Sequence, residues 1–197
     1  MSTIVVSHGL GAGPGSVWFP WFTAELEARG HQVVIPALPE PDGPDPLSWR
    51  QALAEAAQVA PASDTVLVGH SIGGVNVLRM LEAHDGVFAG AVLVSTAARE
   101  VGYDALAGFF SPPFDWERIR ASAWRFRVLA AADDPVNIAD PVMHVGVLVR
   151  ELAATAVVLP DGGHLGAFPD DHIELPEAVR LALDCLNRPD TNRPAHP

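Results

Sequence analysis

Short apolar runs alternate along the chain with longer segments in which apolar residues recur every three or four positions. This alternation is typical of βαβ units, in which a helix crosses over between two parallel strands. The apolar runs are short and apolar on both faces, as expected of strands covered by helices on both sides. Six strands are predicted: Thr3–Ser7, Gln32–Ile35, Thr65–Gly69, Ala91–Ser95, Arg127–Ala131 and Thr155–Leu159.

Six helices are predicted between and after these strands. In the third, Val75, Leu78 and Leu81 recur at a spacing of three and form an apolar stripe for packing on a sheet. Right-handed crossovers would assemble the units into an α/β fold, a doubly wound, mostly parallel six-stranded sheet with helices on both faces. The predicted helices are Trp18–Arg29, Leu47–Ala60, Ile72–His84, Trp116–Ala123, Pro141–Leu152 and His172–Leu186.

Three segments interrupt the pattern. Residues 36–46 contain five prolines and predict a stiff, extended loop. Residues 97–114 lack periodicity and predict a lid-like excursion above the sheet. Residues 187–197 are polar and proline-rich, which favours a disordered tail. A chain of 197 residues without a repeat otherwise fits one domain spanning 1–197.

The composition excludes several classes of protein. Hydrophobic residues make up 49% of the chain and charged residues 18%, which is typical of a globular domain. The net charge of −12 and the scattered basic residues argue against nucleic acid as a partner. The single cysteine, Cys185, lies in an apolar helical run and is interpreted as a packed thiol. Without a leader-like or membrane-spanning apolar stretch, we expect no membrane association and a cytoplasmic protein.

Residues 69–73, Gly-His-Ser-Ile-Gly, match the pattern G-x-S-x-G between a predicted strand and a predicted helix. A serine on such a strand-to-helix turn has a strained backbone and needs small neighbours, which the two glycines supply. With 17 glycines in the chain, chance provides only about 0.07 matches to this pattern. Ser71 is therefore predicted to be a nucleophile.

A serine nucleophile needs a base that accepts its proton. His164 follows the last predicted strand in the segment Pro-Asp-Gly-Gly-His, whose glycines let the loop reach inward. In enzymes with this G-x-S-x-G turn on an α/β sheet, the base follows the last core strand, so His164 is the predicted base. His172 is an alternative that falls in the predicted last helix, and His70 is interpreted as a packing residue.

An acid that orients the base is expected at the end of the preceding strand. Asp133 and Asp134 both occupy that place, and Asp134 is preferred because Pro135 stiffens the backbone after it. Asp133 stays an alternative, with Asp140 and Asp161 as weaker ones.

An acyl-transfer site also needs two N–H donors for the oxyanion. The first predicted donor is the amide of Ile72, directly after the nucleophile. The second is expected in the glycine-rich loop 7–11, where Leu10 is preferred and Gly9 is the alternative.

These residues resemble the small single-domain α/β serine hydrolases of the retinoblastoma-binding protein nine and YdeN type. The matching blocks, spread over about nine-tenths of the chain, are VVSHGLGAG, VLVGHSIGG, AVLVSTA, SPPFDWERIR, AADDPV and LPDGGHLGAF. The resemblance implies a compact α/β-hydrolase-like sheet and hydrolysis of esters or amides. It places the family's nucleophile, acid and base on Ser71, Asp134 and His164.

Aromatic residues of the first loop and the excursion are predicted to line an acyl pocket, although they could instead attach the excursion to the body. They are Trp18, Phe19, Phe109, Phe110, Phe114 and Trp116. We expect cleavage of small apolar esters or amides through an acyl-Ser71 intermediate, without metal or organic cofactor, by a monomer or weak homo-oligomer. Alternatives are a binding or regulatory protein on a hydrolase fold, or a cofactor-free acyltransferase or perhydrolase.

Overall fold

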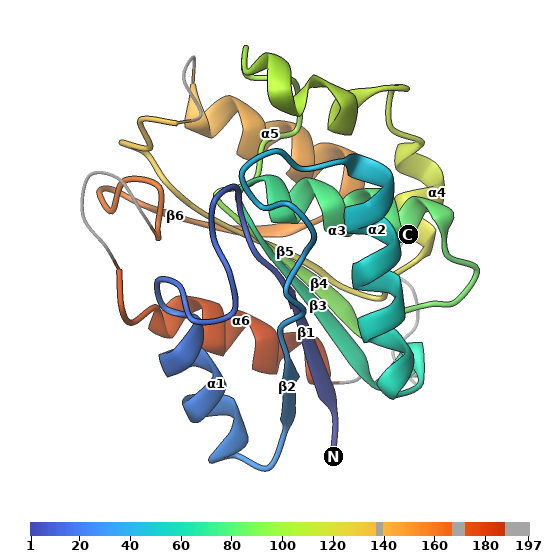
Figure 1. Ribbon diagram of the computed structural model, residues 1–197. Coiled ribbons are helices and arrows are strands. Elements are labelled where there is room, and N and C mark those ends of the chain that lie inside the picture. The colour runs from blue at the N-terminus through green and yellow to red at the C-terminus, as the bar shows by residue number, and fades with distance from the viewer. Residues whose placement is uncertain (137–139, 167–171, 188–197) are drawn as a thin grey trace, which may run out of the picture.

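The computed structural model describes residues 1–136, 140–166 and 172–187. Its centre is a parallel sheet of six strands in the order β2-β1-β3-β4-β5-β6 (Figure 1). The strands are β1 (Thr3–Ser7), β2 (Gln32–Val34), β3 (Thr65–His70), β4 (Gly90–Val94), β5 (Phe126–Ala131) and β6 (Thr155–Leu159). The predicted α/β fold is confirmed, and every predicted strand boundary lies within one residue of the observed one.

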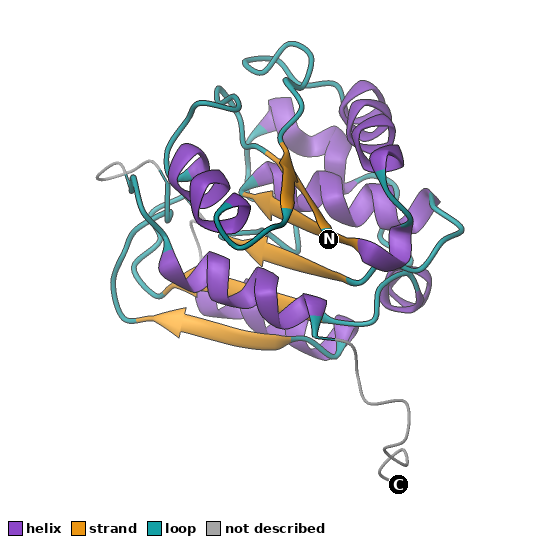
Figure 2. Cartoon of the chain, turned by 90° about the horizontal axis from the view of Figure 1, so that it is seen from below, coloured by secondary structure: helices purple, strands orange, loops and turns teal. Residues whose placement is uncertain are grey.

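Helices cover both faces of the sheet (Figure 2). One layer contains α1 and α6, and the other contains α2, α3, α4 and α5. The helices are α1 (Phe19–Glu27), α2 (Pro46–Ala56), α3 (Ile72–Ala83), α4 (Trp116–Ala121), α5 (Pro141–Leu152) and α6 (Pro176–Leu186). The two layers bury two separate apolar cores against the same strands.

Side chains of the inner strands alternate between these cores, because successive residues of a strand point to opposite faces. In β3, Val66 and Val68 join the core under α1 and α6, whereas Leu67 joins the core under α2 to α5. The edge strands β2 and β6 are partly exposed. Each edge strand still packs against both cores, through Val33 and Val34 in β2 and through Ala156 and Val157 in β6, so the expected cover on both faces is present there but incomplete.

Prolines and aspartates define several helix starts. Pro46, Pro141 and Pro176 each occupy the first turn, where a missing N–H costs no hydrogen bond. The carboxylate of Asp140 accepts hydrogen bonds from the N–H groups of Val142 and Met143 at 3.0 and 3.2 Å. The last helix begins at Pro176 and not at the predicted residue 172, since the amphipathic pattern alone does not show where the first turn closes.

The chain changes direction across the sheet at β1. It passes from β1 to β2 on one side and then returns to β3 on the other side, so that Ser7 pairs with Gly69. In an open α/β sheet, ligands bind in the crevice that such a switch opens at the carboxyl ends of the strands. The loop after β1 and the turn after β3 meet at this crevice.

The excursion over residues 97–114 contains a 3₁₀ helix, Asp104–Phe110. Leu106 and Phe109 of this segment pack with Trp49 and Val75 in a third apolar cluster above the sheet. Within the described ranges, no helix is long and apolar enough to cross a membrane. The predicted disordered tail lies, apart from residue 187, outside the described residues.

Candidate active site

Ser71 occupies a sharp turn between β3 and α3. Its backbone has φ 58° and ψ −129°, a region that residues other than glycine rarely adopt. Neighbouring segments approach this turn closely: a Cβ on Gly69 would lie 2.3 Å from Cα of Gly74, and one on Gly73 would lie 2.2 Å from the carbonyl oxygen of Ser7. Both glycines of the motif are therefore required by space, and Ser71 is held in a strained conformation.

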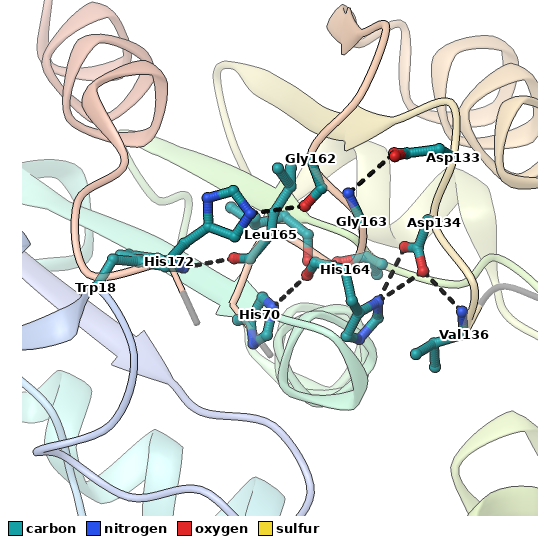
Figure 3. Close-up of polar contacts among 12 residues, drawn as sticks. Trp18, His70, Asp133, Asp134, Val136, Gly162, Gly163, His164, Leu165 and His172 are labelled. Carbon is teal, nitrogen blue, oxygen red and sulfur yellow. Dashed lines mark hydrogen bonds and ion pairs between the residues drawn. The ribbon is translucent and has the colours of Figure 1, made fainter. Parts of the chain in front are cut away.

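His164 and Asp134 form a buried pair (Figure 3). Nδ1 of His164 lies 2.9 Å from each carboxylate oxygen of Asp134. One of these oxygens also accepts the N–H of Val136 at 2.9 Å. A carboxylate accepts only, so Nδ1 of His164 carries a proton, and in the neutral ring Nε2 is free to take one up.

The other candidate acids have different partners. Asp133 is exposed, and its carboxylate accepts the N–H of Gly163 at 2.9 Å. Asp161 is exposed on the same loop. Asp140 caps the first turn of α5. Of the four candidates, only Asp134 contacts the ring of His164 among the described residues.

The loop that carries His164 has an unusual backbone and several side-chain contacts. Gly162, Gly163 and Leu165 have positive φ angles of 136°, 57° and 51°. Trp18 Nε1 donates to the carbonyl oxygen of Leu165 at 2.8 Å, and His172 Nε2 donates to that of Gly162 at 2.7 Å (Figure 3). His172 therefore supports this loop from a position before α6, and the prediction that it lies in the last helix was wrong.

A second buried histidine, His8, lies in the loop after β1. Its Nε2 accepts the N–H of Leu38 at 3.1 Å, and its Nδ1 donates to the carbonyl oxygen of Gly9 at 2.9 Å. Burial lowers the pKa of His8, which favours the neutral ring that can both accept and donate.

These contacts orient the peptide between Gly9 and Leu10. The C=O and N–H of a trans peptide point in opposite directions, so the Leu10 N–H points away from the ring of His8. The next two N–H groups are occupied: that of Gly11 bonds to Pro41 O at 2.8 Å, and that of Ala12 bonds to Gly9 O at 3.3 Å. The loop also lies against the nucleophile, because a Cβ on Gly9 would be 3.2 Å from Cβ of Ser71.

A cavity of about 580 Å³ opens at this point, and both Ser71 and His164 line it. No hydrogen bond joins the two side chains in the part of the chain described, as is common in such sites without substrate. The loop 9–12 forms one wall, and Val101, Leu106 and Phe110 of the excursion form another. Most of the exposed lining is apolar, and Asp42 is the one carboxylate among the described residues that line it.

Only one of the six aromatic residues predicted for the pocket, Phe110, lines this cavity. Trp18 and Phe19 are fully buried in the core between α1 and the sheet, with ring centroids 4.6 Å apart. Phe109 is buried against Trp49. The 3₁₀ helix turns the two adjacent phenylalanines of the excursion in different directions, which sequence periodicity does not show.

Phe114 and Trp116 pack against each other, with centroids 4.7 Å apart, beside the guanidinium of Arg79. They attach the excursion to the body, as the alternative interpretation expected. The aliphatic lining residues Val17 and Val136 come from loops without periodicity, so no sequence signal singled them out.

Comparisons with known proteins agree with this arrangement. The sequence profile of the serine hydrolase family matches residues 4–182. YdeN of Bacillus subtilis is 30% identical over 164 residues, 82% of this chain and 84% of the relative. Serine hydrolase RBBP9 of Rattus norvegicus is 28% identical over 188 residues, 94% of this chain and 95% of the relative.

Solved structures show the same fold. The crystal structure of B. subtilis YdeN superposes with a TM-score of 0.86 at 27% identity and covers 95% of this chain and all of its own. Est1E of Butyrivibrio proteoclasticus, at 13% identity over 95% of this chain and 90% of its own, shares the fold with a TM-score of 0.73. The chain belongs to the serine hydrolase family.

Proposed function

We propose that this hydrolase is carboxylesterase-like and cleaves small apolar esters or amides through an acyl-Ser71 intermediate. One observation carries the proposal: the strained Ser71 and the Asp134-paired His164 line the same cavity. A serine hydroxyl becomes a stronger nucleophile beside a general base, and an acid on the other nitrogen of that base orients it. The shared cavity of Ser71 and His164 and the pairing of His164 with Asp134 support such an arrangement.

In the acylation step, Nε2 of His164 takes the hydroxyl proton of Ser71 while Oγ attacks the substrate carbonyl carbon. The Asp134 carboxylate stabilises the imidazolium that forms. The tetrahedral intermediate then collapses, and His164 gives the proton to the departing alcohol or amine. The products of this half-reaction are the acyl-Ser71 ester and the free leaving group.

The negative oxygen of the intermediate needs donors that are in place before the reaction. We assign this role to the N–H of Ile72, at the start of α3, and to the N–H of Leu10. The hydrogen bond from His8 to Gly9 O supports Leu10, because it turns the Leu10 N–H to the opposite side of the peptide. In deacylation, His164 takes a proton from a water molecule as the water oxygen attacks the acyl carbon. The bond to Oγ then breaks, His164 returns the proton to Oγ of Ser71, and the carboxylic acid leaves.

The cavity lining supports neutral, apolar substrates. Its walls are mainly aliphatic, with Phe110 from the excursion, and such concave apolar sites favour apolar acyl or alcohol groups. Asp42, the one carboxylate found among the described residues of the lining, and the net charge of −12 both disfavour an anionic substrate.

The proposal is tested by hydrolysis of p-nitrophenyl esters with acyl chains of increasing length. We expect measurable turnover that is abolished in Ser71→Ala, with a preference for short to medium chains. Phe110→Ala should shift this preference toward longer chains, whereas Trp116→Ala, outside the cavity and in ring contact with Phe114 but not with Phe110, should leave it unchanged. Turnover by Ser71→Ala equal to that of the wild type would rule out the acyl-serine mechanism.

A further inference from the structure

The imidazole of His70 joins the strand that carries the nucleophile to the loop that carries the base. His70 is the last residue of β3 and directly precedes Ser71. Its Nε2 lies 2.9 Å from the main-chain carbonyl oxygen of His164 (Figure 3). A carbonyl oxygen only accepts, so Nε2 of His70 carries the proton and donates it. A single hydrogen bond thus links the neighbour of Ser71 to the main chain of the base.

His70 keeps this proton arrangement over a wide pH range. Burial lowers the pKa of His70 to about 3, and the nearby rings of His164 and His172 act in the same direction. The hydrogen bond to the His164 carbonyl and the charge of Asp134 oppose this shift without reversing it. The ring is therefore neutral at the pH of an ester assay, with one N–H, and the carbonyl of His164 receives it.

Packing prevents the ring from turning away. The rings of Trp18 and Phe19 lie edge-on to it, with centroid distances of 6.1 and 6.3 Å. On another side, the main chain of Gly166 lies so close that an added Cβ would be 2.6 Å from Cε1 of His70. The loop that carries His164 thus packs directly against the imidazole of His70.

We propose that His70 is a positioning residue that sets the distance between His164 and Ser71, a role that rests on the proposed function. The loop around His164 contains Gly162 and Gly163, which can adopt many conformations, and Leu165 at a positive φ that its side chain disfavours, so local conformational preference does not hold its shape. Among the described contacts, His70 is the one side chain that bonds to the main chain of His164 itself. Proton transfer is sensitive to such placement, since a displacement of about 1 Å can cost about 100-fold in rate.

The test compares two substitutions of similar size, His70→Gln and His70→Met. Gln can place an amide N–H near the position of Nε2, whereas Met fills similar space without a donor. Using p-nitrophenyl butyrate, we expect His70→Met to lower kcat about 10- to 100-fold with KM changed less than about 3-fold. His70→Gln should retain at least about a third of the wild-type kcat, because it keeps the donor.

His84→Leu is the matched control. It removes another imidazole that bonds to main chain, the N–H of Gly86 at 2.7 Å, at the end of α3 opposite to Ser71. We expect its kcat to equal that of the wild type. This control separates loss of the contact with His164 from loss of an imidazole that bonds to main chain in general.

Should His70→Met fail to fold, the Gly166→Ala variant tests the role of His70 instead. Its added methyl would displace the loop from the His70 ring, so kcat should fall while KM is kept; a wild-type kcat would overturn the role of His70. In an active protein, equal kcat values for His70→Met and His70→Gln would also overturn it and leave the proposed function standing. A wild-type protein without esterase or fluorophosphonate reactivity would overturn the proposed function and this role together.

Discussion

The N–H of Gly163 donates to the carboxylate of Asp133 at 2.9 Å. The adjacent Asp134 instead holds Nδ1 of His164, also at 2.9 Å. Two neighbouring carboxylates at the end of β5 thus act on the same loop in different ways. One fixes the main chain before the base, and the other contacts the ring. This difference gives the two residues separable effects on activity.

Asp134→Asn should lower kcat/KM about 10³- to 10⁴-fold, because the imidazolium loses its stabilising charge and the ring its fixed tautomer. Asp133→Asn should lower it less than about 10-fold, since an amide oxygen can still accept from Gly163. Steady-state ester hydrolysis by the two purified variants measures both effects. A larger loss for Asp133→Asn than for Asp134→Asn would refute the assignment of the acid.

Leu10→Pro should lower kcat about 10²- to 10³-fold, because it removes the proposed second oxyanion donor. Leu10→Ala keeps the N–H and is the control for loss of the exposed side chain. It should retain kcat within about 3-fold. Comparable activity of a folded Leu10→Pro variant and the wild type would exclude Leu10 as the donor and favour Gly9.

The free energy of unfolding should fall as pH drops below about 6.5. The pKa of His70 is about 3 in the folded protein and ordinarily 6.5, so between these values the unfolded chain binds a proton that the folded chain does not. Protons then favour unfolding, and this contribution is absent above pH 6.5. The lowered pKa values of His8 and His144, both caused chiefly by burial, act in the same direction.

Urea denaturation at pH 7.5 and pH 5.0 measures this effect. Between these conditions the wild type should lose about 2 kcal/mol more than His70→Gln, which lacks the titrating ring. An equal pH dependence in the two proteins would show that His70 is not the buried neutral group described above.

Asp42→Asn should improve turnover of an anionic ester relative to a neutral ester of the same length by about 2- to 5-fold. Asp42 is exposed at the cavity, so its effect is limited by solvent screening and should weaken in high salt. Competition between p-nitrophenyl butyrate and the monoester of p-nitrophenol with succinate measures the ratio at low and high ionic strength. Identical ratios for the variant and the wild type would show that the charge of Asp42 does not affect substrate selectivity.

The sequence predicts the sheet well because its strands are continuous apolar runs in a repeated βαβ order. The sequence also predicts the turn at Ser71, because close packing requires Gly69 and Gly73 at fixed spacing. Asp134 could only be ranked above Asp133, because both follow β5 and the choice depends on which carboxylate turns toward His164.

Contacts between distant segments could not be predicted. The bond from His70 to His164 O spans 94 positions, and no local pattern separates such a histidine from one that merely packs. Trp18 illustrates the same limit: an aromatic residue in the first loop was expected at the substrate, whereas its indole N–H holds Leu165 O. Likewise, His8 accepts the N–H of Leu38, whose loop approaches the end of β1 only in the folded protein.

Intact-protein and peptide mass spectrometry after reaction with a fluorophosphonate measures directly whether Ser71 is an activated nucleophile. We predict one adduct per chain, located on Ser71, absent from Ser71→Ala and formed far more slowly in His164→Ala. A folded wild-type protein that stays unmodified, or a His164→Ala variant that is modified as fast as the wild type, would contradict the activation of Ser71 by His164.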